Sequence, residues 1–128
     1  MRIEHIAIWS PDIERLKQFY MTYFGAVSND LYKNKKTGFT SYFLTFKEGA
    51  RLEIMNKKEI LPFEQLDKEQ MGYCHLAMSV GSESEVIRLT NSLREDGYRI
   101  TGEPRMTGDG YFESVVADPD GNRIELTC

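Results

Sequence analysis

The stretch DPDGNRIEL, residues 118–126, combines a tight turn with a short strand near the end of the chain. Asp-Pro-Asp-Gly is a strong turn signal, because proline fixes one backbone dihedral angle and glycine tolerates a positive φ. Side chains alternate along the strand that follows, so Ile124 and Leu126 point to one face and Glu125 points to the other. A strand that buries its apolar face therefore directs one carboxylate to the opposite side, where it needs a partner.

The length and composition are those of one globular domain. The chain has 128 residues, of which 41% are hydrophobic and 28% are charged, which is enough apolar side chain for a core. No apolar run approaches the length that crosses a bilayer, and the amino terminus enters an alternating strand pattern at once instead of a signal-peptide core. We therefore predict a soluble, cytoplasmic protein with no membrane partner.

Charge and cysteine content argue against two further classes of protein. The net charge is −4 and the basic residues are scattered, apart from Lys33, Lys35 and Lys36, so we expect no nucleic acid partner. Cys74 and Cys128 are too few for a disulfide framework or a zinc knuckle. We expect each to be a buried or terminal thiol.

Apolar periodicity predicts the same order of elements in both halves of the chain. The first half contains an alternating strand, a helix, a weaker strand and a hairpin, which we place at 2–9, from Ser10 to Gly25, at 26–32, and at 40–46 with 50–55. The second half contains a strand, a helix that starts with a capping box, and three further strands, which we place at 72–80, from 82 to Gly97, and at 98–101, 111–117 and 123–127.

Each half thus reads as one β-α-β-β-β module within a single domain, residues 1–128. Module 1 covers about 1–56 and module 2 about 72–128. The linker at 57–71 is charged and contains Pro62, which suits a connection with at most a short helical turn at 63–66.

The two modules repeat a histidine and a glutamate at matching positions. His75 follows His5 by 70 residues, and Glu125 follows Glu53 by 72 residues, so nearly one offset superposes both pairs. The apolar neighbours of these residues would pack under the helices, which leaves the four polar side chains on the opposite, concave face.

Taken singly, each of the four residues has a plainer explanation. A strand histidine is more often a hydrogen-bonded structural residue, and an inward glutamate is commonly paired with an arginine. The chain has only two histidines, however, and both occupy the matching position. Two imidazoles and two carboxylates are a plausible ligand set for Ni²⁺, Co²⁺, Zn²⁺, Mn²⁺ or Fe²⁺, and such a mixed set leaves room for water or substrate, as a catalytic site does.

Four stretches together resemble the vicinal oxygen chelate superfamily of glyoxalases, bleomycin-resistance proteins and dioxygenases: EHIAI at 4–8, RLEIM at 51–55, CHLAMSV at 74–80, and DPDGNRIEL at 118–126. The resemblance covers the whole chain. It implies an α+β fold in which tandem βαβββ modules form a curved, incompletely closed mixed sheet around a metal, and it implies a homodimer. By this resemblance His5, Glu53, His75 and Glu125 look like the four ligands of the glyoxalase I branch.

The activity implied by the resemblance is that of a metal-dependent lyase or isomerase. Its small-molecule substrate would carry two adjacent oxygens, as a 2-oxoaldehyde hemithioacetal does, and Glu125 or Glu53 would be the base that moves a proton between carbons. Two alternatives stay open: a metal-dependent thiol transferase or dioxygenase of the same fold, and a non-catalytic small-molecule binding protein.

Three residues are candidates for a substrate pocket. Many glutathione-dependent glyoxalases carry an arginine four residues after the first histidine, where this chain has Trp9, which cannot make a bidentate carboxylate contact. Trp9 would line an apolar pocket or belong to the core. Arg51 and Arg105 would bind an anionic substrate, with solvated surface as the plainer expectation for Arg105; three glycines predict that 102–110 is a mobile flap.

Overall fold

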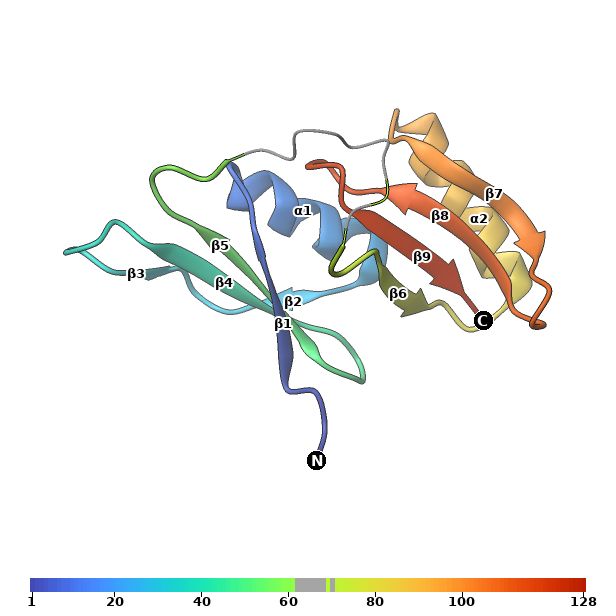
Figure 1. Cartoon of the computed structure of the whole chain (residues 1–128), viewed down its shortest axis with the longest axis horizontal. Helices are drawn as coiled ribbons and strands as arrows, with labels where there is room; N and C mark the ends of the chain where they lie inside the picture. Colours follow the sequence, from blue (N-terminus) through green and yellow to red (C-terminus); the bar gives the residue numbers. More distant parts are fainter. Residues whose placement is uncertain (62–68, 70) are drawn as a thin grey trace. The chain divides into compact units, whose positions relative to one another are not determined.

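A computed structural model describes residues 1–61, 69 and 71–128. The chain divides into two compact units, Met1–Glu64 and Gln65–Cys128, each with one long helix and one sheet of its own (Figure 1). Both sheets mix parallel and antiparallel strands, and neither closes into a barrel. The prediction of an α+β fold with tandem modules of mixed sheet is therefore confirmed.

The first unit holds one helix and five strands. Their bounds are β1 His5–Trp9, α1 Ile13–Phe24, β2 Val27–Ser28, β3 Tyr32–Lys33, β4 Thr40–Thr45 and β5 Arg51–Asn56. The sheet order is β1-β5-β4-β2, and β3 also pairs with β4. The pairing of β1 with β5 is parallel, whereas β4 pairs with β5 as an antiparallel hairpin.

The second unit repeats this plan with four strands. Their bounds, with those of the helix, are β6 Leu76–Ser79, α2 Glu83–Glu95, β7 Ile100–Met106, β8 Phe112–Ala117 and β9 Arg123–Thr127. The sheet order is β6-β9-β8-β7, and the pairing of β6 with β9 is parallel. Figure 1 shows α2, in yellow, running beside the orange strands β7 and β8.

Each sheet buries one face under its own helix. Leu52 and Ile54 of β5, and Ile124 and Leu126 of β9, are almost completely buried, as their alternation with polar residues predicts. The helices contribute matching apolar stripes, with Leu16, Phe19 and Tyr20 in α1 and Val86, Leu89 and Leu93 in α2. Glu53 and Glu125 therefore lie on the opposite side of each sheet, which we call the helix-free face.

The local signals explain where several elements start and stop. Gly25 ends α1 in the left-handed conformation that glycine adopts without strain, and Ser82 caps α2 by accepting a hydrogen bond from the backbone of Glu85. In the turn before β9, the backbone N–H of Gly121 donates to the carbonyl of Asp118, and the N–H of Asp118 donates to Asn122. This hydrogen-bonded turn ends just before β9 begins at Arg123.

Three predicted boundaries are wrong near the amino ends of elements. The first strand starts at His5 instead of residue 2, and β6 starts at Leu76, so His75 lies just before its strand. The cap of α1 is Asp12, not Ser10, because the Asp12 carboxylate accepts from the N–H of Arg15 while Ser10 accepts from Asp12.

Other predictions are corrected or fall outside the described residues. The proposed flap at 102–110 is wrong, because β7 continues to Met106 and pairs with β8; only the turn after it remains a loop. Cys74 is an exposed free thiol, not a buried one. The helical turn predicted at 63–66 lies outside the residues that the structure describes. In the described parts of the chain, no helix is long and apolar enough to cross a membrane.

Candidate metal centre

The parallel pairing of β1 with β5 brings the first histidine and glutamate together. Ala7 is the register partner of Glu53, and His5 lies two residues earlier on the same face. The distance from Nε2 of His5 to Oε2 of Glu53 is 3.8 Å. The imidazole is 40% exposed and the carboxylate 15%, so the histidine faces solvent more openly than the glutamate.

The second unit builds the same pair in the same way. Ala77 of β6 is the register partner of Glu125 in β9, and His75 precedes the strand by one residue. The distance from Nε2 of His75 to Oε2 of Glu125 is 3.4 Å, and the side chains are 40% and 18% exposed. The structure therefore joins the four predicted residues into two histidine–glutamate pairs, one in each unit.

The donor atoms of each pair suit a divalent transition ion. Imidazole nitrogen and carboxylate oxygen are both common ligands of such ions, at about 2.0–2.2 Å. Two donors at that distance from one ion lie about 2.8–3.6 Å apart, from adjacent octahedral positions to tetrahedral ones. The 3.4 Å separation in the second pair falls in that range, and the 3.8 Å separation in the first is slightly wider.

In the part of the chain that the structure describes, each unit brings two such donors together. Among residues 1–61, 69 and 71–128, no three His, Cys, Asp or Glu side chains gather closely enough to hold a metal ion. The pairs are thus each half of the four-residue set that the sequence predicts.

The first pair is surrounded by charged and aromatic side chains. The carboxylate of Glu4 contacts both Nδ1 of His5 and the guanidinium of Arg51. These two hydrogen bonds, first that from His5 and then that from Arg51, lower the pKa of Glu4. The guanidinium of Arg51 also lies 4.3 Å from the ring centroid of Phe43, whose edge meets the His5 ring.

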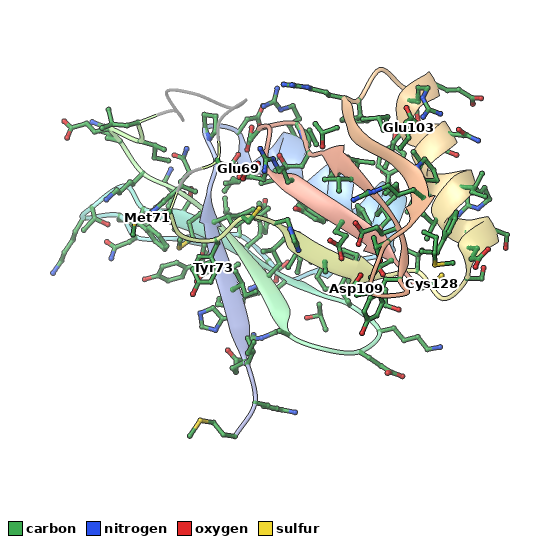
Figure 2. All side chains as sticks on the ribbon, turned by 45° about the vertical axis from the view of Figure 1, so that its right-hand side comes forward. Glu69, Met71, Tyr73, Glu103, Asp109 and Cys128 are labelled. Carbon is green, nitrogen blue, oxygen red and sulfur yellow. The ribbon has the colours of Figure 1, made fainter. Side chains whose placement is uncertain are left out.

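In the second unit, the arginine that corresponds to Arg51 is Arg123, and its carboxylate partner is a different residue. Arg123 donates hydrogen bonds of 2.8 and 2.9 Å to the two carboxylate oxygens of Glu69, a residue labelled in Figure 2. Arg123 also lies 3.7 Å from the sulfur of Cys74. The ion pair with Glu69 raises the pKa of Arg123.

Besides Arg51, described above, two further residues were predicted to line a substrate pocket. Trp9 is 42% exposed, so the core interpretation is wrong; its ring lies under the ammonium of Lys57 at 4.7 Å and on the same face as His5. Arg105 lies in β7 and not in a flap; its side chain is 56% exposed, as the solvated-surface expectation has it, and it forms a 3.2 Å ion pair with Glu113 of β8.

Sequence reasoning missed the contact between Glu4 and His5. Alternation along a strand places adjacent residues on opposite faces, so a strand starting at residue 2 would have separated these two side chains. The strand actually starts at His5, which leaves the Glu4 side chain free to reach the imidazole of its neighbour. The pairing of Glu113 with Arg105 was missed for a similar reason, because 102–106 was expected to be a loop.

The two repeated units and their mixed sheets define a tandem βαβββ protein, in which the single strand predicted at 26–32 is two short strands, β2 and β3. The chain belongs to the Glyoxalase/Bleomycin resistance protein/Dioxygenase superfamily, whose family model matches residues 2–126. The family resemblance predicted from the sequence is therefore confirmed.

Three similar proteins illustrate this relationship. The uncharacterized protein YqjT of Bacillus subtilis (strain 168) is 25% identical over 129 residues, which cover 98% of each chain. The trypanothione-dependent glyoxalase I of Leishmania major has a TM-score of 0.77 at 25% identity, over 98% of this chain and 85% of its own. A glyoxalase I mutant from Zea mays has a TM-score of 0.77 at 23% identity, and this chain spans 44% of its length.

Proposed function

We propose that the protein is a divalent-metal-dependent lyase or isomerase that acts on a small substrate with two adjacent oxygens. The metal ligands would be His5, Glu53, His75 and Glu125, and the ion would be Ni²⁺, Co²⁺, Zn²⁺, Mn²⁺ or Fe²⁺. The observation that carries the proposal is the repetition of one histidine–glutamate pair, on the helix-free face, at the matching strands of both units. Membership of the superfamily supports it.

The protein side chains would supply proton transfer. When bound, a divalent ion would act as a Lewis acid that polarises the substrate carbonyl. A carboxylate oxygen of Glu53 or Glu125 would take the proton from the carbon that bears the hydroxyl and return it to the neighbouring carbon. No oxidant is needed, because one carbon is oxidised as its neighbour is reduced. The partial burial of both carboxylates limits access of water to the proton in transit.

The substrate class would be 2-oxoaldehyde hemithioacetals. Trp9, on the same face as His5 and Glu53, would offer an apolar wall to such a substrate. Arg51 would bind an anionic group only after leaving the Glu4 carboxylate, and Arg105 only after leaving Glu113. A thiol other than glutathione therefore suits this face better.

Metal binding is the primary test. Protein purified without added metal would be analysed for transition metals and titrated with Ni²⁺, Co²⁺ and Zn²⁺ by calorimetry. We expect about one equivalent of metal for each four-ligand centre. The affinity should be at least tenfold weaker in Glu53→Gln and in Glu125→Gln. Glu48→Gln and Glu103→Gln are the matched controls, because both glutamates are exposed and lie outside the pairs. Wild-type protein that takes up no metal would refute the enzymatic proposal and leave a non-catalytic binder.

Turnover is the second test. The metal-loaded protein would be assayed with methylglyoxal hemithioacetals of glutathione and of several other thiols, in water and in deuterium oxide. We expect one thiol to support turnover, and the variant that lacks the base to lose proton exchange even when enough metal is added to saturate its weakened site. Metal uptake without turnover of any hemithioacetal would instead favour a thiol transferase or dioxygenase of the same fold.

We further propose that the protein is a homodimer in which a four-donor centre can combine pairs from two chains, because the described residues of each unit place one histidine–glutamate pair together. Light scattering would give the mass in solution. Mixing a chain with His5→Ala and Glu53→Gln with a chain with His75→Ala and Glu125→Gln would distinguish two assemblies. Tight metal binding by the mixture alone would mean that each centre combines pairs from two chains; no recovery would mean that both pairs come from one chain.

A further inference from the structure

Glu4 holds a position that the paired metal ligands alone do not explain. Its carboxylate accepts hydrogen bonds from Nδ1 of His5 and from the guanidinium of Arg51. Its backbone is fixed as well, because the N–H of Arg51 donates to the Glu4 carbonyl at 3.1 Å. A residue just before the strand is thereby attached to β5 by both its main chain and its side chain.

The aromatic ring of Phe43 completes this cluster. Arg51 lies over its face at 4.3 Å, and the His5 ring meets it at 5.4 Å with an interplanar angle of 83°. Cation–π attraction holds the guanidinium against the ring, and the edge-on contact restricts rotation of the imidazole. The cluster of Glu4, His5, Phe43 and Arg51 thus constrains the imidazole at Nδ1 and through its T-shaped contact with Phe43.

A carboxylate that accepts a hydrogen bond from one imidazole nitrogen determines whether the other nitrogen carries a proton or a free lone pair. When Nδ1 donates its proton to an acceptor, the neutral ring carries no proton on Nε2, whose lone pair is then free. Nε2 of His5 is the nitrogen that faces Glu53. We propose that Glu4 is a positioning residue that holds His5 in the Nδ1-protonated tautomer and so presents Nε2 as a ligand atom. The tautomer is a property of the metal-free protein; only its use in metal binding rests on the proposed function.

The second unit provides an internal comparison. The residue before His75 is Cys74, and the carboxylate that pairs with the equivalent arginine, Arg123, is that of Glu69. Within the described residues, no carboxylate contacts Nδ1 of His75. The two histidines should therefore differ in tautomer preference although their glutamate partners match.

The direct test is the tautomer of each histidine in metal-free protein. Long-range ¹H–¹⁵N correlation spectra would be recorded on ¹⁵N-labelled, chelator-treated protein at about pH 8.5, well above the ordinary histidine pKa of about 6.5. We expect Nδ1 of His5 to be protonated in the wild type and the Nε2–H form, which neutral imidazole favours in water, to dominate in Glu4→Ala. Glu4→Gln should retain the wild-type tautomer, because its amide oxygen still accepts from Nδ1. His75 signals should not change.

Two results would overturn the proposal: an Nε2–H tautomer of His5 in the wild type, or an Nδ1–H tautomer of His5 that persists in Glu4→Ala. Glu48→Ala, at an exposed hairpin position of the same unit, is the control. A calorimetric metal titration then separates this proposal from the function. We expect about 10- to 100-fold weaker binding in Glu4→Ala. Equal binding by the wild type and Glu4→Ala would refute the positioning role alone, whereas a wild type that binds no metal would refute the function and leave the tautomer result intact.

Discussion

The turn before β9 offers a sharp test of how the second unit is held together. The side chain of Asp118 is 4% exposed and accepts three hydrogen bonds. The backbone N–H groups of Asp120 and Asn122 each donate to Oδ1 at 2.9 Å, and the Asn122 amide donates to Oδ2 at 2.8 Å. Replacing Asp118 by alanine removes the acceptor for all three donors.

The expected loss in free energy of unfolding follows from the number of hydrogen bonds that Asp118→Ala removes. A typical intramolecular hydrogen bond contributes about 1 kcal/mol net, so Asp118→Ala should lower the free energy of unfolding by about 3 kcal/mol. Asp118→Asn should cost less than about 1 kcal/mol. Its side-chain oxygen can accept from both backbone N–H groups, and a flip of the Asn122 amide lets the new NH₂ group donate to the Asn122 oxygen.

Urea unfolding followed by circular dichroism would measure both variants. With an m-value of about 2 kcal/mol/M, a loss of 3 kcal/mol moves the midpoint down by about 1.5 M. The control is Asp30→Ala, at an exposed position, which we expect to stay within about 0.5 kcal/mol of the wild type. A loss below about 1 kcal/mol for Asp118→Ala, or equal losses for the alanine and asparagine variants, would refute the reasoning.

The same carboxyl makes a pH-dependent contribution. Burial raises the pKa of Asp118, despite the opposing hydrogen bonds from Asn122 and Asp120. The folded protein therefore binds this proton more tightly than the unfolded chain does, so the contribution of Asp118 to stability falls as the pH rises from about 3.9 through the folded pKa. Asp118→Asn has no titrating carboxyl at this position. Its stability relative to the wild type should therefore increase as the pH rises from about 3.9 through the folded pKa of Asp118. A relative decrease in parallel urea experiments would contradict the assignment.

Three further predictions concern packing and can be measured in the same urea experiments. Leu93→Ala should cost about 2–5 kcal/mol, because this side chain of α2 is completely buried. Thr90→Val and Ser114→Ala should each cost about 1–3 kcal/mol but the double variant less than their sum, because the two buried hydroxyls bond each other at 2.7 Å. Trp9→Phe should cost less than about 1 kcal/mol, because Trp9 lies outside the core with 42% of its surface exposed; a core-sized loss would contradict this.

Much of the fold could be predicted from alternation and local signals. The bounds of β9 agree with the sequence prediction, and the buried face of β5 is the one that Leu52 and Ile54 indicate. Wrong boundary predictions fall where two local sequence signals compete for the same structural position. Ser10 and Asp12 are both good capping residues, and only the position of the first helical turn decides that Asp12 caps α1 and Ser10 supports Asp12.

The candidate site was predictable only in part. The repeat identified all four residues of the pairs, because a duplicated module carries its functional positions at nearly one offset. Glu4 and Glu113 could not be found in this way. Their roles depend on one-residue details, namely where β1 starts and how far β7 extends, and sequence patterns define such boundaries poorly.

The way in which the pairs are built bears on how a metal would bind. The glutamate of each pair lies in a parallel ladder between two neighbouring strands of one unit, β1 with β5 and β6 with β9; His5 lies in the first ladder, and His75 lies one residue before the second. A ladder fixes donor positions more tightly than a loop does, because a register slip of one residue would turn every side chain to the other face. For the proposed metal centre this means that both pairs are in place without an ion, so that binding would not bear the cost of ordering them. The turn at Asp118 belongs to the same argument, since it sets the residue at which β9 begins and hence the face on which Glu125 lies.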